Sequence, residues 1–112
     1  METMKLIQTL KLMRTKVGEM PIQQFELFLY IAESDGEIAQ VDLTKLIGSQ
    51  QGTVSRNITR LSEKIIDNFD GPPKKVGHGL IEKRLSGEGR RENLFLTKKG
   101  KNVYSKILSI LK

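Results

Sequence analysis

The chain has 112 residues, a formal net charge of +6 and no cysteine. Its length allows one domain with one modest core, and the missing cysteines exclude disulfides, thiolate catalysis and cysteine-based metal sites. The charge favours an anionic partner, and residues 71–112 hold eleven basic side chains against three acidic ones.

Two helices and a short strand are expected in the first third of the chain. Leu6, Leu10, Met13 and Val17 recur at the spacing of one helical face over residues 3–17, and Gly18 ends this helix. Pro21 suits the first turn of a second helix, because its missing N–H would have no partner there. The densest apolar face of the chain follows, formed by Ile22, Phe25, Phe28, Leu29 and Ala32. Ile38 then adds a short strand.

The next segment predicts a helix-turn-helix. "VDLTKLIG" at residues 41–48 is expected to form a short helix with Gly48 as its C-cap, burying Val41, Leu43, Leu46 and Ile47. Ser49 is expected to cap a following helix, whose core-facing stripe is Val54, Ile58, Leu61 and Ile65. Two helices joined across a tight Gly-Ser corner are typical of a helix-turn-helix.

The remaining chain predicts a hairpin and a last helix. The second helix of the pair is expected to end near Asn68, because the Gly-Pro-Pro of "DGPPKK" cannot continue it. "HGLIEKRLS" and "ENLFLT" surround the glycine-rich "GEGRR" and read as two antiparallel strands. Thr97 caps a helix over residues 98–111. The expected fold class is therefore α+β and mainly helical, in the order helix, helix, strand, helix, helix, strand, strand, helix.

This order resembles the winged helix-turn-helix domain of the MarR-type (multiple antibiotic resistance regulator) family of DNA-binding transcriptional regulators. The resemblance is carried by "DLTKLIGSQQGTVSRNITRL", "GLIEKR" and "GEGRRENLFLTKKG", within residues 21–101. It implies one winged-helix domain over residues 1–112, with a core at 20–97 between dimerisation helices at 1–18 and 98–112. Residues 62–78 are longer than the family's connection between the recognition helix and "GLI", and the role of this insert stays open.

The resemblance implies double-stranded DNA as the partner, and the side chains of the recognition helix agree with it. Its outward face is small or rich in donors, which suits a major groove about 12 Å wide. The amides of Gln50 and Gln51 can form paired hydrogen bonds with adenine, and the guanidinium of Arg56 can do so with guanine. Arg60, one turn further along, is expected to contact a phosphate. The expected contacts of this helix are Ser49, Gln50, Gln51, Gly52, Thr53, Ser55, Arg56, Asn57 and Arg60. The expected wing contacts are Lys83, Arg84, Arg90 and Arg91. The alternative is that both surfaces only face water.

The first and last helices carry apolar stripes that are wide for one small domain to cover. Packing against the same helices of a second copy would give a twofold homodimer. The expected interface is Leu6, Leu10, Met13, Val103, Ile107 and Leu111. Two recognition helices one DNA turn apart would then read an inverted repeat. The alternative is a monomer in which the two helices cover each other.

The sequence therefore predicts a dimeric, sequence-specific regulator of transcription, most simply a repressor that blocks polymerase at a promoter. Two alternatives stay open: an adaptor that holds a protein through the acidic first 40 residues and the segment around Phe69 and Val76, or an architectural or replication-partition DNA-binding protein.

Nothing in the sequence suggests an enzyme. His78 is the only histidine, and the chain carries no phosphate-loop or dinucleotide motif, so we expect no metal or cofactor. A small-molecule effector cannot be identified. Because no secretory cleavage site follows the N-terminal residues and no run approaches the ~20 apolar residues that cross a bilayer, we expect a cytoplasmic, nucleoid-associated protein without a membrane partner.

Overall fold

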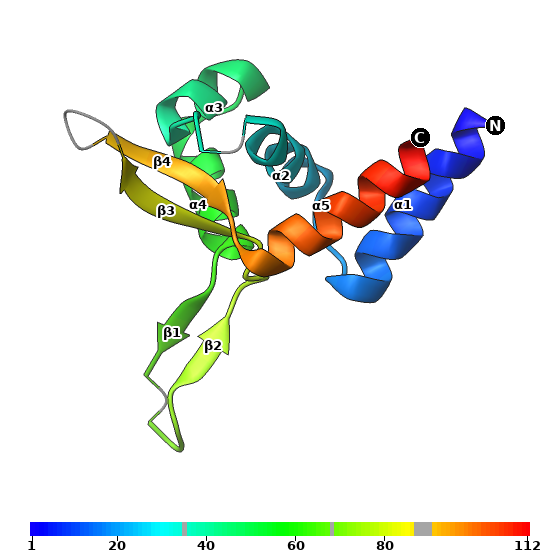
Figure 1. Cartoon of the computed structure of the whole chain (residues 1–112). Helices are drawn as coiled ribbons and strands as arrows, with labels where there is room; N and C mark the ends of the chain where they lie inside the picture. Colours follow the sequence, from blue (N-terminus) through cyan, green and yellow to red (C-terminus); the bar gives the residue numbers. More distant parts are fainter. Residues whose placement is uncertain (35, 68, 87–90) are drawn as a thin grey trace.

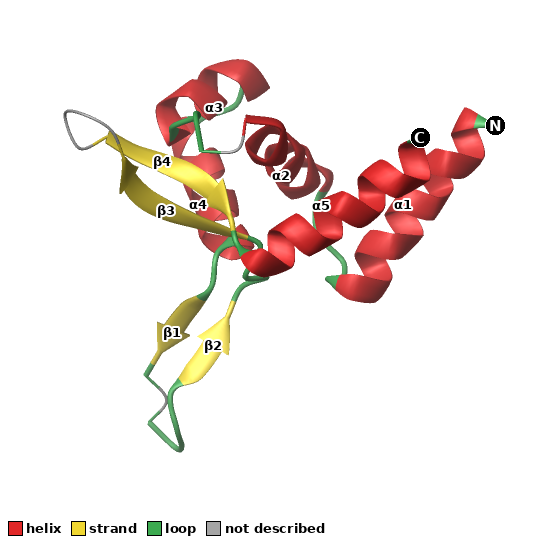
Figure 2. Ribbon diagram, in the orientation of Figure 1, coloured by secondary structure: helices red, strands yellow, loops and turns green. Residues whose placement is uncertain are grey.

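The computed structural model describes residues 1–34, 36–67, 69–86 and 91–112 (Figures 1 and 2). Its helices are α1 (Glu2–Lys16), α2 (Ile22–Ser34), α3 (Gln40–Ile47), α4 (Gln51–Leu61) and α5 (Lys98–Leu111). One antiparallel hairpin joins β1 (Lys64–Ile66) to β2 (Lys74–Val76), and another joins β3 (Ile81–Ser86) to β4 (Arg91–Leu96). This confirms the expected mainly helical winged-helix class and adds a hairpin, β1–β2, that the sequence analysis did not predict.

The core lies where α2, α3 and α4 meet one face of the β3–β4 hairpin. Ile81, Leu94 and Leu96 point to one face of the hairpin and are buried, as expected for a sheet packed on helices, whereas Leu85 toward the far end of β3 is 58% exposed. Leu94 of β4 also forms a backbone hydrogen bond to an earlier segment of the chain. Its N–H donates to the carbonyl of Ile38 over 2.9 Å, which confirms the short strand expected at Ile38. The most fully buried core side chains are Leu27, Phe28, Ile31, Leu43, Val54, Ile58, Leu61, Leu80, Ile81, Leu94 and Ile107.

Three side chains expected in the core are exposed. Ile22 is 86% exposed because it occupies the first helical position of α2. Val41 and Leu46 are also exposed, because α3 has only eight residues and turns Leu43 inward. The apolar pattern of a helix this short overstates how much of it the core can cover.

The corner between α3 and α4 differs from expectation in one residue. Gly48 adopts the left-handed conformation, with φ of +68°, and its N–H donates to the carbonyl of Thr44, so the predicted C-cap is confirmed. The residue at the N-cap of α4 is Gln50, in extended conformation and without a side-chain bond to the helix. The predicted capping role of Ser49 is therefore wrong.

The end of α4 is the largest departure from the sequence analysis. The helix stops at Leu61 rather than near Asn68, which lies outside the described residues, and Ile65 is exposed on β1 instead of continuing the buried stripe. The chain leaves the helix in extended conformation at Ser62, with ψ of 175°. The β-branched pair Ile65–Ile66 then pairs with β2 across the Gly-Pro-Pro turn.

The returning chain supplies the hydrogen bonds that close this helix end. The N–H groups of His78 and Leu80 donate to the carbonyls of Arg60 and Leu61 over 2.9 and 2.8 Å. The last carbonyls of a helix lack partners within the helix, and these bonds satisfy two of them. Gly77 makes the approach possible, because a Cβ at this residue would collide with the carbonyl oxygen of Ser62.

The helices α1 and α5 pack side by side, and the two chain termini lie near each other (Figure 1). Lys5 Nζ donates to the carbonyl of Lys112 over 2.9 Å. Thr97 accepts a hydrogen bond from the N–H of Gly100, which confirms the predicted cap of α5.

Three residues expected at a dimer interface belong instead to the chain's own core. Met13, Val103 and Ile107 are almost fully buried in the hydrophobic core, so these three side chains do not form the exposed apolar stripe that was expected. In this respect the two helices cover each other, as the monomeric alternative requires. Leu6, Leu10 and Leu111 stay about half exposed on the α1–α5 pair.

Gly100 offers a test of how closely α5 packs. A Cβ at this helical residue would collide with the carbonyl oxygen of Leu80, whereas a Cβ at Gly52 on α4 would meet nothing nearer than Arg56 Nη1 at 3.8 Å. We expect Gly100→Ala to lower the free energy of unfolding by about 1–3 kcal/mol through overpacking. The matched control Gly52→Ala should leave it unchanged or raise it by up to about 1 kcal/mol. Urea unfolding followed by circular dichroism measures both, and equal stabilities for the two variants would contradict the packing described here.

Candidate nucleic-acid interface

The outward face of α4 is a continuous polar surface. The buried side chains Val54, Ile58 and Leu61 hold the helix against the core. The opposite face carries small side chains, amides and two arginines, and its first turn contains Gly52 with open space around it. The exposed or half-exposed members are Ser49, Gln50, Gln51, Gly52, Thr53, Ser55, Arg56, Thr59 and Arg60.

Arg56 lies at the centre of this face. Its Nη2 donates to Thr53 Oγ1 over 3.3 Å, one turn earlier on the helix. This contact is exposed, and Nη1 lies 3.8 Å from the place of a Cβ on Gly52, so the guanidinium lies over the first turn of α4. A bidentate arginine is the commonest side-chain partner of guanine in the major groove, so the geometry suits Arg56 for that role.

Asn57 does not belong to this face, and the prediction that it contacts DNA is wrong. Its side chain is only 7% exposed and points toward the start of α2. Asn57 Nδ2 donates to Gln23 Oε1 over 2.8 Å, and Asn57 Oδ1 accepts from Gln24 Nε2 over 3.1 Å. The residue therefore fixes α4 against α2 through two side-chain hydrogen bonds, one of them buried.

Gln24 completes this buried polar contact. It is 2% exposed, and among the described residues its Oε1 atom has no hydrogen-bond partner. A buried amide is costly unless it is hydrogen-bonded, so the contact with Asn57 is needed to keep Gln24 inside. Sequence reasoning missed Gln23 and Gln24 as positioning residues, although the polar pair inside the apolar "PIQQFELF" was a visible signal.

The two predicted wing contacts on β3 point in different directions. Lys83 is exposed on the side of α4 and lines the same groove as Thr59. Arg84 lies on the other face of the hairpin, where its guanidinium carbon is 3.9 Å from the centre of the Phe95 ring and its Nε is 3.2 Å from Glu82 Oε1. Lys83 thus lies beside α4, and Arg84 contacts Phe95 and Glu82 within the β3–β4 hairpin.

The tip of the wing carries the remaining predicted contacts. Arg90 lies outside the described residues. Arg91 begins β4, opposite Ser86 in the register, but its side chain lies outside the described part of the structure. The expectation that both arginines contact DNA is therefore neither supported nor contradicted by the geometry.

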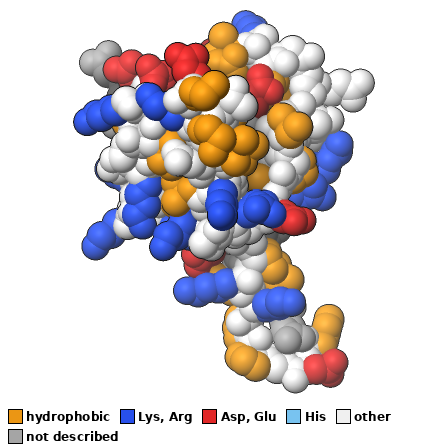
Figure 3. Space-filling view, turned by 90° about the vertical axis from the view of Figure 1, so that its right-hand side faces the viewer, with side chains coloured by type: hydrophobic (Ala, Val, Ile, Leu, Met, Phe, Trp, Pro, Cys, Tyr) orange, Lys and Arg blue, Asp and Glu red, His pale blue; other side chains and the backbone are white. Residues whose placement is uncertain are grey.

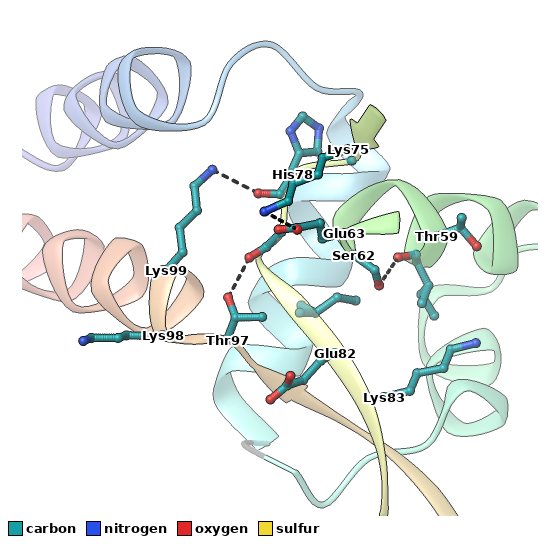
Figure 4. Close-up of a pocket in the computed structure, with 14 residues that line it drawn as sticks. Thr59, Ser62, Glu63, Lys75, His78, Glu82, Lys83, Thr97, Lys98 and Lys99 are labelled. Atoms are coloured by element: carbon teal, nitrogen blue, oxygen red, sulfur yellow. Dashed lines mark hydrogen bonds and ion pairs between the residues drawn. The ribbon is translucent and has the colours of Figure 1, made fainter. Parts of the chain in front are cut away.

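A groove of about 810 Å³ runs beside the C-terminal half of α4 (Figure 4). Thr59 and Ser62 line it from α4, and Lys83 and Glu82 from β3. The start of α5 and the base of the β1–β2 hairpin close the other side, with Lys98, Lys99, Lys75 and Glu63. Two of these lysines are engaged: Lys99 Nζ donates to the carbonyl of His78 over 3.0 Å, and Lys75 lies 3.4 Å from Glu63.

His78 lies in this groove beside Lys99. Partial burial, followed by the nearby charge of Lys99, lowers the pKa of His78 below its ordinary value of 6.5. Both effects disfavour the protonated ring. His78 is half-buried in this groove.

Two other kinds of site are not found in the described residues. No three or more His, Asp or Glu side chains there lie close enough together to hold a metal ion. Within the same ranges, none of the helices combines the length and hydrophobicity that a bilayer crossing requires.

Comparisons with known proteins support the fold. No protein-family model matches the sequence, and neither does any curated protein. A solved structure, the crystal structure of MarR, is similar to this chain with a TM-score of 0.59 and 22% sequence identity. The similarity covers 96% of this chain and 70% of the MarR chain. The chain therefore has a MarR-like winged-helix fold, and at this identity the likeness carries the fold alone.

Asn57 and Arg56 are adjacent in sequence and have opposite roles in this structure. Asn57→Ala removes the partner of two amides, one of them fully buried, so we expect the free energy of unfolding to fall by about 1–3 kcal/mol. Arg56→Ala removes only an exposed contact and should change it by no more than about 0.5 kcal/mol. Urea titration of both variants checks this. A larger loss for Arg56→Ala than for Asn57→Ala would contradict the assignment of the two faces.

Proposed function

We propose that this protein is a homodimeric, sequence-specific double-stranded DNA-binding regulator of transcription, acting most simply as a repressor. The observation that carries the proposal is the outward face of α4. It is exposed, free of bulky apolar side chains, and held by buried contacts on its other side. A face of this kind suits insertion into the major groove.

Charge supports the same proposal. The residues that flank α4, from the groove and from β3, include Lys83, Lys98 and Lys99, and the chain has a net charge of +6. Lysines beside a recognition helix neutralise phosphates and position the protein without reading sequence. Gln50, Gln51 and Arg56 would then supply the base contacts.

The proposed homodimer uses the outer surface of the α1–α5 pair. Leu6, Leu10 and Leu111 are each about half exposed there, together with Met4 and Leu108. A cluster of exposed leucines on two adjacent helices is typical of an interaction surface. A twofold axis through this surface would place two α4 helices to read an inverted repeat.

An architectural or replication-partition DNA-binding protein is the second candidate, and the lysine-lined groove is the feature that favours it. Such a protein would bind through phosphates and show a steep salt dependence without a preferred site. Selection from genomic DNA separates the two functions, because only the first enriches a defined sequence.

Selection from sheared genomic DNA of the host, followed by sequencing of the bound fragments, is expected to recover an inverted repeat with half-sites about ten base pairs apart. On the recovered site, Arg56→Ala should weaken binding by about 1–3 kcal/mol and relax the preference at one base pair. Lys83→Ala serves as the matched control. It should weaken selected and unrelated DNA alike and reduce the salt slope by about one unit.

Three outcomes of this selection are informative. Full affinity of Arg56→Ala for the recovered site would refute the assigned reading face. Retention of DNA without enrichment would favour the architectural function. No retention at low salt would refute DNA binding and favour the protein-adaptor alternative.

The dimer is tested by sedimentation equilibrium at tens of micromolar protein. We expect the wild type to sediment at twice its 12.7 kDa mass. Leu6→Glu should shift it to a monomer, because two charges would then be buried without partners at the interface. Val41→Glu, at a similarly exposed residue on α3, is the control and should leave the dimer intact. A wild type of 12.7 kDa would contradict the proposed dimer.

A further inference from the structure

The β1–β2 hairpin, which we call the arm (residues 63–76), projects away from the body of the molecule (Figures 1 and 3). Phe69 near its tip is fully exposed at 105%, and Ile65 and Ile66 on β1 are exposed as well. Among the described residues, none of the buried core comes from the arm. An isolated two-stranded hairpin is marginally stable in water. The arm therefore presents apolar side chains that its own chain does not cover.

The charges at the tip of the arm argue against nucleic acid as its partner. The lysines lie on the paired strands: Lys75 is 3.4 Å from Glu63, and Lys74 pairs with Ile66 at the last position before the tip. Residues 67–73, which form the tip beyond these strands, contain two aspartates, Asp67 and Asp70, and no basic residue. Phosphate groups would repel this tip. An apolar tip with negative charge instead fits an apolar pocket that has basic side chains at its rim.

One pocket of the described structure has this character. It lies between α1 and the start of α2, has a volume of about 670 Å³, and is walled mainly by apolar side chains. Lys11 and Arg14 of α1 stand at its rim with one acidic residue, Glu19. The volume exceeds what a phenyl ring needs. The apolar wall consists of Ile7, Leu10, Met13, Met20, Ile22 and Phe25.

We propose that the tip of the arm docks in the α1–α2 pocket of a second copy of this chain, with Phe69 against the apolar wall and Asp67 and Asp70 near Lys11 and Arg14. This inference rests on the homodimer proposed above and adds a second contact between its subunits. The pocket and the proposed dimer surface share one residue: Leu10 lines the pocket and also belongs to the exposed surface of the α1–α5 pair.

Twofold symmetry makes a second copy the fitting occupant. In a symmetric dimer the arm of each subunit would fill the pocket of the other. The same contact would then occur twice, and it would cover the apolar tip and the apolar pocket of both subunits. The arm cannot serve its own chain in this way in the structure described, since it extends from the end of α4 away from α1 (Figure 1).

Cysteine trapping tests the contact directly, because the chain has no cysteine of its own. Phe69→Cys and Ile22→Cys are prepared as separate proteins, mixed and mildly oxidised. We expect a disulfide-linked heterodimer that a reducing agent dissolves. A mixture of Phe69→Cys with Val41→Cys, at an exposed residue of α3 outside the pocket, is the matched control and should give only background cross-linking.

Sedimentation equilibrium gives a second readout. Phe69→Ser should raise the dimer dissociation constant about tenfold or more, because the buried aromatic surface is lost. Val41→Ser, a similar loss at an exposed site, should leave the constant within about twofold. Phe69 is fully exposed within the chain, so its replacement does not threaten folding.

The outcomes separate this inference from the function on which it rests. A wild-type dimer without the Phe69–Ile22 cross-link, and with an unchanged constant for Phe69→Ser, would overturn the arm contact and leave the dimer standing. A monomeric wild type would overturn both. The DNA selection described above is read independently of either result.

Discussion

Three backbone N–H groups, those of His78, Gly79 and Leu80, donate to the carbonyls that end α4, and the placement of both hairpins depends on them. A helix terminus leaves its last carbonyls without intrahelical partners. Here the chain satisfies them with its own returning strand, and β3 then starts beside the helix. The wing direction relative to the recognition helix, the groove between them and the base of the arm all follow from this closure. Gly77 is the residue that permits it, because no side chain fits against Ser62.

Two kinds of contact hold the inner side of α4. Its inner side combines aliphatic packing with the amide bonds of Asn57 to Gln23 and Gln24. Aliphatic packing is not directional and tolerates small rotations, whereas amide hydrogen bonds fix a helix about its own axis. The outer side can therefore carry Gly52, small hydroxyls and flexible arginines without losing its orientation. The outer side chains of α4 thus stand on a helix whose orientation is fixed, and Lys83, Lys98 and Lys99 lie in the groove beside it.

Local signals in the sequence predicted local structure well. The predictions of Gly48 at the helix corner, Thr97 at the start of α5 and two antiparallel strands at residues 78–97 are confirmed, because each depends on neighbours a few residues away. The end of α4 was not predicted, because its cause lies sixteen or more residues downstream, in His78 and Leu80. The side chain of Asn57 was misassigned for a similar reason: its partners are 33 and 34 residues away. Periodicity identifies the apolar faces of α1 and α5, but it does not tell which apolar side chains are buried in the core and which stay exposed. The buried Met13, Val103 and Ile107 are therefore grouped with the exposed Leu6, Leu10 and Leu111 in the sequence analysis.

The closure at the end of α4 also bears on how this fold can change over evolutionary time. The two ends of the arm are already held together at its base, so a longer or shorter segment between them alters only a closed loop. Each doubling of such a loop costs only about 0.6 kcal/mol in closure entropy. Insertions and deletions at this point leave the core and the strand register of the wing untouched. The junction is therefore a place where lineages can acquire, exchange or lose an appendage, and homologous chains should vary in length most between Ser62 and Gly77.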